Sequence, residues 1–185
     1  MRIMFLFMII SSLSLFADEY NVDKDQKNLV KFISDAPIEE FEGNTKDIDG
    51  YLIASPNDVT DNSELYFLVE LTTLDTGIGL RNRHMRENYL HTDEYPRAEF
   101  TGAITKADKK GDSWDVIVEG VMKIHGKDKK MKVNGKMTKT TNGFRIQANF
   151  IVKLSDHNIE IPSLMVSKID ENMKLKVDFF LKNVS

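Results

Sequence analysis

The chain has 185 residues, which favours one domain or at most two small ones, and its 41% share of hydrophobic residues is enough for a folded core. With 25 basic and 29 acidic side chains, its formal charge is −4, which argues against a nucleic-acid partner because phosphate contacts need clustered cations. Cysteine is absent, which excludes disulfides, thiolate metal sites and a cysteine nucleophile.

Residues 1–17 have the features of a secretory signal peptide. Arg2 supplies a positive charge, residues 3–10 form an unbroken apolar run, and Ala17 is a small residue just before the polar Asp18. The run is too short to cross a bilayer comfortably, since spanning takes about 20 apolar residues. We therefore expect cleavage after Ala17, export of a mature domain of residues 18–185, and no stable membrane insertion after cleavage. An uncleaved anchor is the alternative.

The first half of the mature chain is predicted to contain strands and one helix. Alternation of apolar and polar residues predicts strands near residues 27–34, 46–54 and 64–72. The alternation then stops between Gly77 and Tyr89, where Leu80, His84 and Met85 fall on one face of a helix. Asp75 or Thr76 can cap that helix. We expect one short helix between two strands.

The second half is predicted to be an antiparallel meander of four strands, from about residue 97 to residue 154. Turn signals separate its strands, and Asn142-Gly143 is the strongest short hairpin signal among them. Residues 158–168, which include Pro162, predict a long loop before a last strand near residues 173–182.

These elements amount to about eight strands in one all-β domain. Long antiparallel strands with one apolar face can pack as a sandwich or close into a barrel, and an eight-stranded barrel can hold one small ligand. The apolar residues at inward-facing positions are the candidate lining: Phe67, Val69, Phe100, Ile104, Trp114, Val116, Val118, Met131, Val133, Ile146, Phe150, Val177 and Phe179. Alternation alone does not say whether these side chains fill the barrel or surround a cavity.

Two blocks of the sequence resemble the YceI-like family. The first runs from Asp75-Thr76-Gly77 through Arg81 and Arg83-His84-Met85-Arg86 to Tyr95-Pro96, and the second ends a strand at Ile124-His125-Gly126. The resemblance covers nearly all of residues 20–182. It implies an eight-stranded antiparallel, lipocalin-like barrel with one short helix between strands and a long apolar cavity.

The resemblance also implies a ligand class and a location. Some members of the family bind polyisoprenoid chains, such as the tails of isoprenoid quinones, and members are either periplasmic or cytosolic. The signal peptide favours the exported, periplasmic or secreted branch. The first strand departs from the family's usual pattern, because it reads Leu29-Val30-Lys31-Phe32-Ile33. The identity of the lipid is therefore not carried over.

Arg81 and His84 are the candidate polar ligand-binding residues, because they could meet a polar head group at one end of the barrel. The alternative is that they hold the helix over the barrel through hydrogen bonds to backbone carbonyls. His84 and His91 lie seven residues apart, but nothing else resembles a zinc pattern, so we expect no metal.

The sequence therefore predicts an exported, non-enzymatic protein that holds a polyisoprenoid or similar apolar lipid for transport or storage. No cofactor is expected beyond a bound isoprenoid lipid or quinone, since the common nucleophile-elbow, phosphate-loop and metalloprotease motifs are missing. The alternatives are a stress-related or partner-binding barrel with a filled core, and an enzyme that uses the His84 region. Whether two copies form a homodimer is left open.

Overall fold

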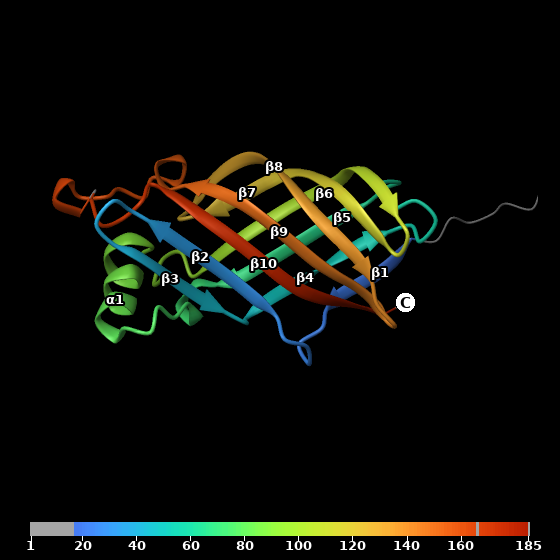
Figure 1. The fold of residues 1–185 in the computed structure, drawn as a ribbon, viewed down its shortest axis with the longest axis horizontal. Helices are drawn as coiled ribbons and strands as arrows, with labels where there is room; N and C mark the ends of the chain where they lie inside the picture. The colour runs from blue at the N-terminus through green and yellow to red at the C-terminus, as the bar shows by residue number, and fades with distance from the viewer. Residues whose placement is uncertain (1–16, 166, 185) are drawn as a thin grey trace, which may run out of the picture.

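Eight antiparallel strands close into a barrel in the computed structural model, which describes residues 17–165 and 167–184 (Figure 1). The predicted signal peptide therefore lies almost entirely outside the described residues. Ring closure comes from the pairing of the first strand with the last, Tyr20 opposite Asn183. In order around the ring the strands are β1 (Asp18–Val22), β4 (Ile48–Ala54), β5 (Glu64–Glu70), β6 (Arg97–Lys110), β7 (Ser113–Ile124), β8 (Lys127–Lys139), β9 (Gly143–Lys153) and β10 (Asn172–Asn183).

Two further strands, β2 (Leu29–Asp35) and β3 (Glu40–Thr45), extend the wall at one end. The long strand β10 pairs with β1 at its C-terminal end and with β2 nearer its start, so β1 and β2 share one edge of β10. The eight-stranded barrel is confirmed, but the eight strands that form it are not the eight that were predicted. The strand predicted near residues 27–34 lies outside the ring, and β1 and β3 were not predicted. Both are five or six residues long and rich in charged side chains, so they carry little alternation.

The predicted meander is confirmed as β6 to β9, joined by three hairpins. His125 and Gly126 both have positive φ, 50° and 69°, as a two-residue hairpin turn between β7 and β8 requires. The pairing of β8 with β9 covers only Gly135–Lys139, so the first half of β8 has no ladder partner on β9 among the described residues. The short helix η3 (Leu154–His157) packs against β8 there.

The predicted helix between two strands is also confirmed. It is α1 (Gly79–His84), continued by the π-helical turn η2 (Met85–Tyr89) and preceded by the short η1 (Leu71–Thr73). The predicted cap is wrong, because Ile78 is the N-cap and no side chain caps the helix. Thr76 instead donates from its backbone and hydroxyl to Asn82 Oδ1, at 2.8 and 2.7 Å. The predicted loop around Pro162 contains one short turn, η4 (Ser163–Met165).

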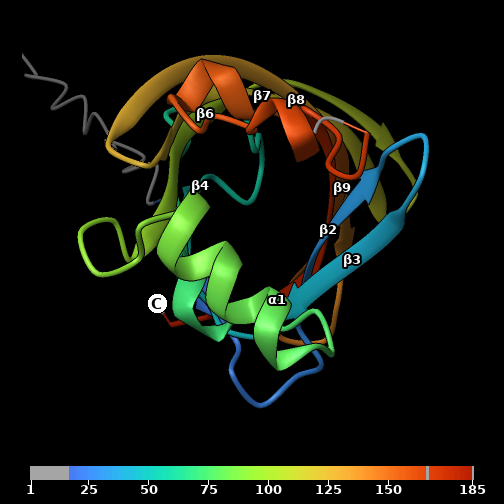
Figure 2. The ribbon, with the colours of Figure 1, turned by 90° about the vertical axis from the view of Figure 1, so that its left-hand side faces the viewer.

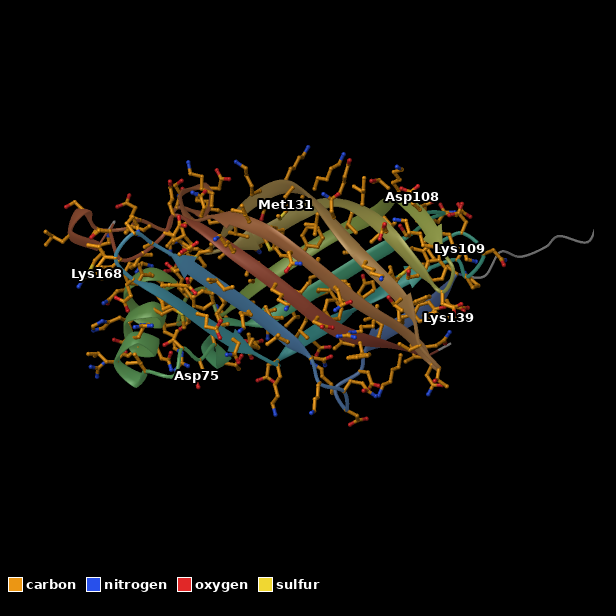
Figure 3. All side chains as sticks on the ribbon, in the orientation of Figure 1. Asp75, Asp108, Lys109, Met131, Lys139 and Lys168 are labelled. Carbon is orange, nitrogen blue, oxygen red and sulfur yellow. The ribbon has the colours of Figure 1, made fainter. Side chains whose placement is uncertain are left out.

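One end of the barrel is plugged by aromatic side chains. Tyr20 and Trp114 both pack on Phe144, with ring centroids 4.8 and 5.9 Å apart. Trp114 also lies under the Lys109 ammonium, close to the β6–β7 hairpin, and Figure 3 shows Lys109 at the end of the barrel opposite α1. The plug closes that end, so any space inside the barrel opens toward α1.

A partly buried ion pair ties β9 to β10 on the outside of the wall. Arg145 donates two hydrogen bonds to Asp178, at 2.8 and 2.6 Å, and Gln147 donates a third at 3.0 Å. The hydrogen bonds from Arg145 lower the pKa of Asp178 below its ordinary value of 3.8. Because the folded pKa is the lower one, the pair stabilises the fold fully above about pH 4 and loses this effect as the pH falls through the folded pKa.

Asp178→Asn is therefore expected to lower the free energy of unfolding at neutral pH by about 1 kcal/mol. The difference from the parent should shrink as the pH falls below about 4, because protonated aspartate already resembles asparagine. Denaturant unfolding at several pH values measures this. Glu119→Gln, in the exposed pair with Lys132, serves as the control and should have no measurable effect. A difference for Asp178→Asn that stays constant across the acid range would contradict the interpretation.

Candidate functional site

A cavity of about 530 Å³ occupies the interior of the barrel between the aromatic plug and α1. This volume lies within the usual range for small-molecule pockets, roughly 300–1,000 Å³. Its wall comes from strands β2 to β10, from the α1–η2 segment and from the loop before β10. Nearly all of the lining side chains are apolar. The exceptions are Glu39, Arg81, His84, Tyr89, Glu99 and Lys168.

Thirteen of the fifteen predicted ligand-binding residues lie on the cavity wall. They are Phe67, Val69, Arg81, His84, Phe100, Ile104, Val116, Val118, Val133, Ile146, Phe150, Val177 and Phe179. Trp114 and Met131 do not. Trp114 belongs to the aromatic plug, and Met131 lies in the half of β8 that has no partner on β9. Correct inward alternation therefore does not by itself place a residue on the cavity wall.

Sequence reasoning missed part of the wall, above all the apolar side chains that do not come from long strands. Phe32 and Phe41 come from the β2–β3 hairpin, and their rings meet edge to face with centroids 6.1 Å apart. The alternating pattern around Phe32 was visible, but nothing in it indicated that this hairpin extends the barrel. Further missed residues come from helical and loop segments without alternation: Leu71, Leu74, Ile78, Leu80, Met85, Leu90, Ile159, Met165 and Ile169. Others, such as Leu52, Met137 and Leu175, lie on strands that were predicted but were not named as cavity lining.

The α1–η2 segment covers part of the open end of the barrel (Figure 2). Arg81 Nη2 donates to Glu39 Oε1 at 2.6 Å, and its guanidinium carbon lies 4.6 Å from the centre of the Phe41 ring. Arg86 Nη2 donates to the Leu74 carbonyl at 3.0 Å, on the segment that leads into the helix. Arg81 therefore fastens the helix through a carboxylate and a ring, whereas Arg86 binds a backbone carbonyl. We call the Arg81–Glu39 contact the latch.

The other three histidines form a chain of hydrogen bonds beside this cover. His91 Nδ1 and His125 Nε2 are 2.9 Å apart, His125 Nδ1 is 3.2 Å from the His157 carbonyl, and His157 Nδ1 is 3.0 Å from the Lys127 carbonyl. Because a carbonyl only accepts, His125 donates from Nδ1 to the His157 carbonyl. These hydrogen bonds join the segment after η2 to the β7–β8 turn and to η3. No group of three or more possible metal ligands occurs in the described residues.

Breaking the latch is expected to speed ligand exchange. The pair is partly exposed, so its loss removes about 1 kcal/mol or less from the closed cover. A change of that size corresponds to about a fivefold faster release of a fluorescent hydrocarbon probe from Arg81→Ala, measured by stopped-flow dilution. Glu39→Gln should also make release of the probe faster. Arg83→Ala is the matched control, because Arg83 lies exposed on the same helix. Equal release rates in the Arg81 and Arg83 variants would contradict the latch.

A closed antiparallel barrel around an apolar interior is the architecture of lipocalin-like binding proteins. The sequence model of the YceI-like domain matches residues 20–181, and the chain therefore belongs to the YceI-like family. In the part of the chain that the structure describes, every helix is too short or too polar to span a bilayer. No curated protein matches the chain.

Several solved structures share the fold. BcnA from Burkholderia cenocepacia is 18% identical, with a TM-score of 0.73 over 85% of this chain and 98% of that one. A polyisoprenoid binding domain from Saccharophagus degradans, implicated in plant cell wall breakdown, is 16% identical, with a TM-score of 0.69 over 90% and 99% of the two chains. The YceI protein of Campylobacter jejuni is 17% identical, with a TM-score of 0.61 over 77% and 84%. These likenesses show that the barrel fold is shared with the three proteins.

Proposed function

We propose that this protein binds one polyisoprenoid or similar long apolar lipid in the barrel cavity and carries or stores it after export. The observation that carries the proposal is the apolar cavity itself, plugged at one end and lined almost entirely by hydrocarbon and aromatic side chains. Such a tube suits a chain without polar groups along its length. The apparent signal peptide at residues 1–17 supports export.

The energetics favour a long ligand over a short one. Each methylene removed from water contributes about 0.8 kcal/mol. Association itself costs about 4–15 kcal/mol, so several isoprene units are needed to offset it. Met85 and Met165 lie on the wall among the aliphatic residues, and their flexible thioether side chains suit a surface that adapts to a chain.

The polar groups of the wall are placed where a lipid head group would be. Arg81, His84 and Lys168 belong to the α1 segment and to the loop before β10, which flank the open end. Arg81 is already paired with Glu39, whereas His84 is exposed. A quinone carbonyl, hydroxyl or phosphate at this end could accept a hydrogen bond from His84 or Lys168.

The cavity argues against the alternative of a barrel with a filled core. An enzyme is also the weaker alternative, because His84 is exposed on the cover and a binding role needs no reactive group inside the tube. The family match and the polyisoprenoid-binding neighbour favour a binding protein.

Organic extraction of the purified protein, followed by mass spectrometry, tests the proposal directly. We expect an isoprenoid or other long-chain lipid in the extract, and one molecule of added isoprenoid quinone bound per delipidated chain. The absorbance of the quinone that stays with the protein after gel filtration measures this stoichiometry. A clean extract together with no uptake of added quinone would overturn the lipid-binding function.

A further inference from the structure

Exposed aliphatic side chains gather around the open end of the barrel. Six large apolar side chains are exposed in the described residues, and four of them belong to segments at this end. They are Ile38 (70% exposed), Ile78 (49%), Leu80 (54%) and Leu164 (89%). We call these four residues the rim. The other two lie elsewhere: Ile151 is on the outer face of β9, and Val184 follows β10 near the C-terminus at the opposite end (Figure 1).

The rim is one surface, because direct contacts join the three segments that carry it. The Ile38 backbone N–H donates to the Ser167 carbonyl at 3.0 Å, which ties the β2–β3 turn to the loop before β10. The latch ties the same turn to α1, and the Asp170 N–H donates to Ser34 Oγ at 2.9 Å. Figure 2 shows α1 and the loop before β10 on the same end of the barrel, and Figure 3 labels Lys168 at that end.

The rim is continuous with the wall of the cavity. Ile78 and Leu80 are half exposed to solvent and also line the cavity. Met165, the neighbour of Leu164, lines it from the loop side, as does Ile169. Apolar side chains therefore lead from the outside of the molecule into the tube at two places, the start of α1 and the loop before β10.

We propose that the rim seats the open end of the barrel on the surface of a lipid bilayer, with its four side chains inserted among the acyl chains. This proposal rests on the proposed function, because a long apolar chain dissolves only in a membrane or in the cavity. With the rim inserted, the lipid chain passes between the membrane and the cavity through apolar surroundings. A carrier whose mouth stood in water would have to expose the chain at every transfer.

The chemistry of the rim favours a bilayer over a protein partner. Its members are all aliphatic, whereas the central residues of protein interfaces are enriched in tryptophan, tyrosine and arginine. The charges beside it are of both signs: Arg83 and Lys168 are exposed, and so are Glu40 and Glu160. Attraction to anionic head groups is therefore not the driving force. The driving force is the shallow burial of aliphatic side chains, which should occur on neutral and anionic membranes alike.

A single fluorescent label tests the orientation on the membrane. Because the chain has no cysteine, Leu164→Cys provides a unique thiol for an environment-sensitive nitrobenzoxadiazole label. Val184→Cys is the control, since Val184 is half exposed and its backbone is anchored to Glu19 at 3.0 Å. The probes are vesicles of phosphatidylcholine, and vesicles of phosphatidylethanolamine with phosphatidylglycerol. We expect the emission at position 164 to rise several-fold and its quenching by iodide to fall on both, with no change at position 184.

Three results would overturn the docking proposal. The first is a label at position 164 that stays open to iodide with both kinds of vesicle. The second is equal shielding at positions 164 and 184, which would mean nonspecific adsorption or binding through another segment. The third is shielding at 164 that grows with protein concentration without vesicles, which would mean that a second copy of the chain covers the rim.

A double variant separates docking from cavity binding. Ile38→Ser with Leu164→Ser should take up a fluorescent isoprenoid from a soluble cyclodextrin complex as the parent does, because neither side chain lines the cavity. Uptake from vesicles should become about tenfold slower or more. Val184→Ser should leave both rates unchanged. Uptake from vesicles at the parent rate would overturn the docking proposal alone. Rim insertion in a parent that takes up no isoprenoid from either source would overturn the carrier function alone.

Discussion

Val133→Trp is expected to weaken the binding of a long apolar chain strongly while leaving the barrel folded. Val133 lies in β8 with 8% of its surface exposed, and its side chain is part of the cavity wall. An indole at this position extends into the tube, because the strand holds the backbone in place. If it excludes about four methylenes of the ligand, at about 0.8 kcal/mol each, affinity falls about 100-fold or more. Overpacking of a full core costs about 1–3 kcal/mol, and free space in the cavity should reduce that cost.

Asn134→Trp is the matched control for this substitution. Asn134 is the next residue of the same strand, exposed on the outer face, so the same indole is added without entering the cavity. Its affinity for the isoprenoid should equal that of the parent. Near-ultraviolet circular dichroism and thermal unfolding show whether each variant is folded. Parent-like affinity in a folded Val133→Trp protein would mean that the ligand does not occupy the tube.

The course of the long strands was predictable because a strand with one buried face leaves a pattern of period two. Strands β6 to β9 follow this pattern, and their hairpins have matching turn residues. Strand β3 does not, because Phe41 is its only large apolar side chain. The position of Trp114 in the plug could not be predicted either. Alternation shows which face of the sheet a side chain is on, but not how far it lies from the end of the barrel. The latch joins residues 42 positions apart in the sequence, and no local signal relates them.

Whether the barrel is hollow could not be read from alternation either. Filled and hollow barrels have the same inward pattern, and the volume left inside depends on the sizes of the side chains that meet there. Ala98, Gly135 and Ala148 are small residues on the wall of the cavity, and their missing side-chain volume helps to keep it open. Gly135 and Ala148 are paired across β8 and β9, which concentrates that effect at one level of the tube. Such a pairing is visible only after the register is known.

The wall also depends on a glycine whose replacement is expected to be severely destabilising. Gly50 in β4 has φ of +128°, a conformation that residues with a side chain rarely adopt. A Cβ atom there would lie 2.0 Å from the Tyr66 carbonyl oxygen and 2.8 Å from the Phe67 Cα. Both are backbone atoms of β5, so neither can move aside without separating the strands. Gly50→Ala should therefore lower the free energy of unfolding by about 3 kcal/mol or more.

Gly111→Ala separates conformational strain from the clash. Gly111 has φ of +61° in the β6–β7 turn, and a Cβ there would have no atom within 4 Å, so strain alone should cost about 1 kcal/mol. Denaturant unfolding compares the two variants. If both variants lose the same free energy of unfolding, backbone strain alone explains both losses, and the close approach of β4 to β5 is not needed. If Gly50→Ala remains folded, it should also bind the isoprenoid more weakly than Gly111→Ala. The reason is that Gly50 pairs with Phe67, whose ring lines the cavity and packs on Phe179 at 4.9 Å.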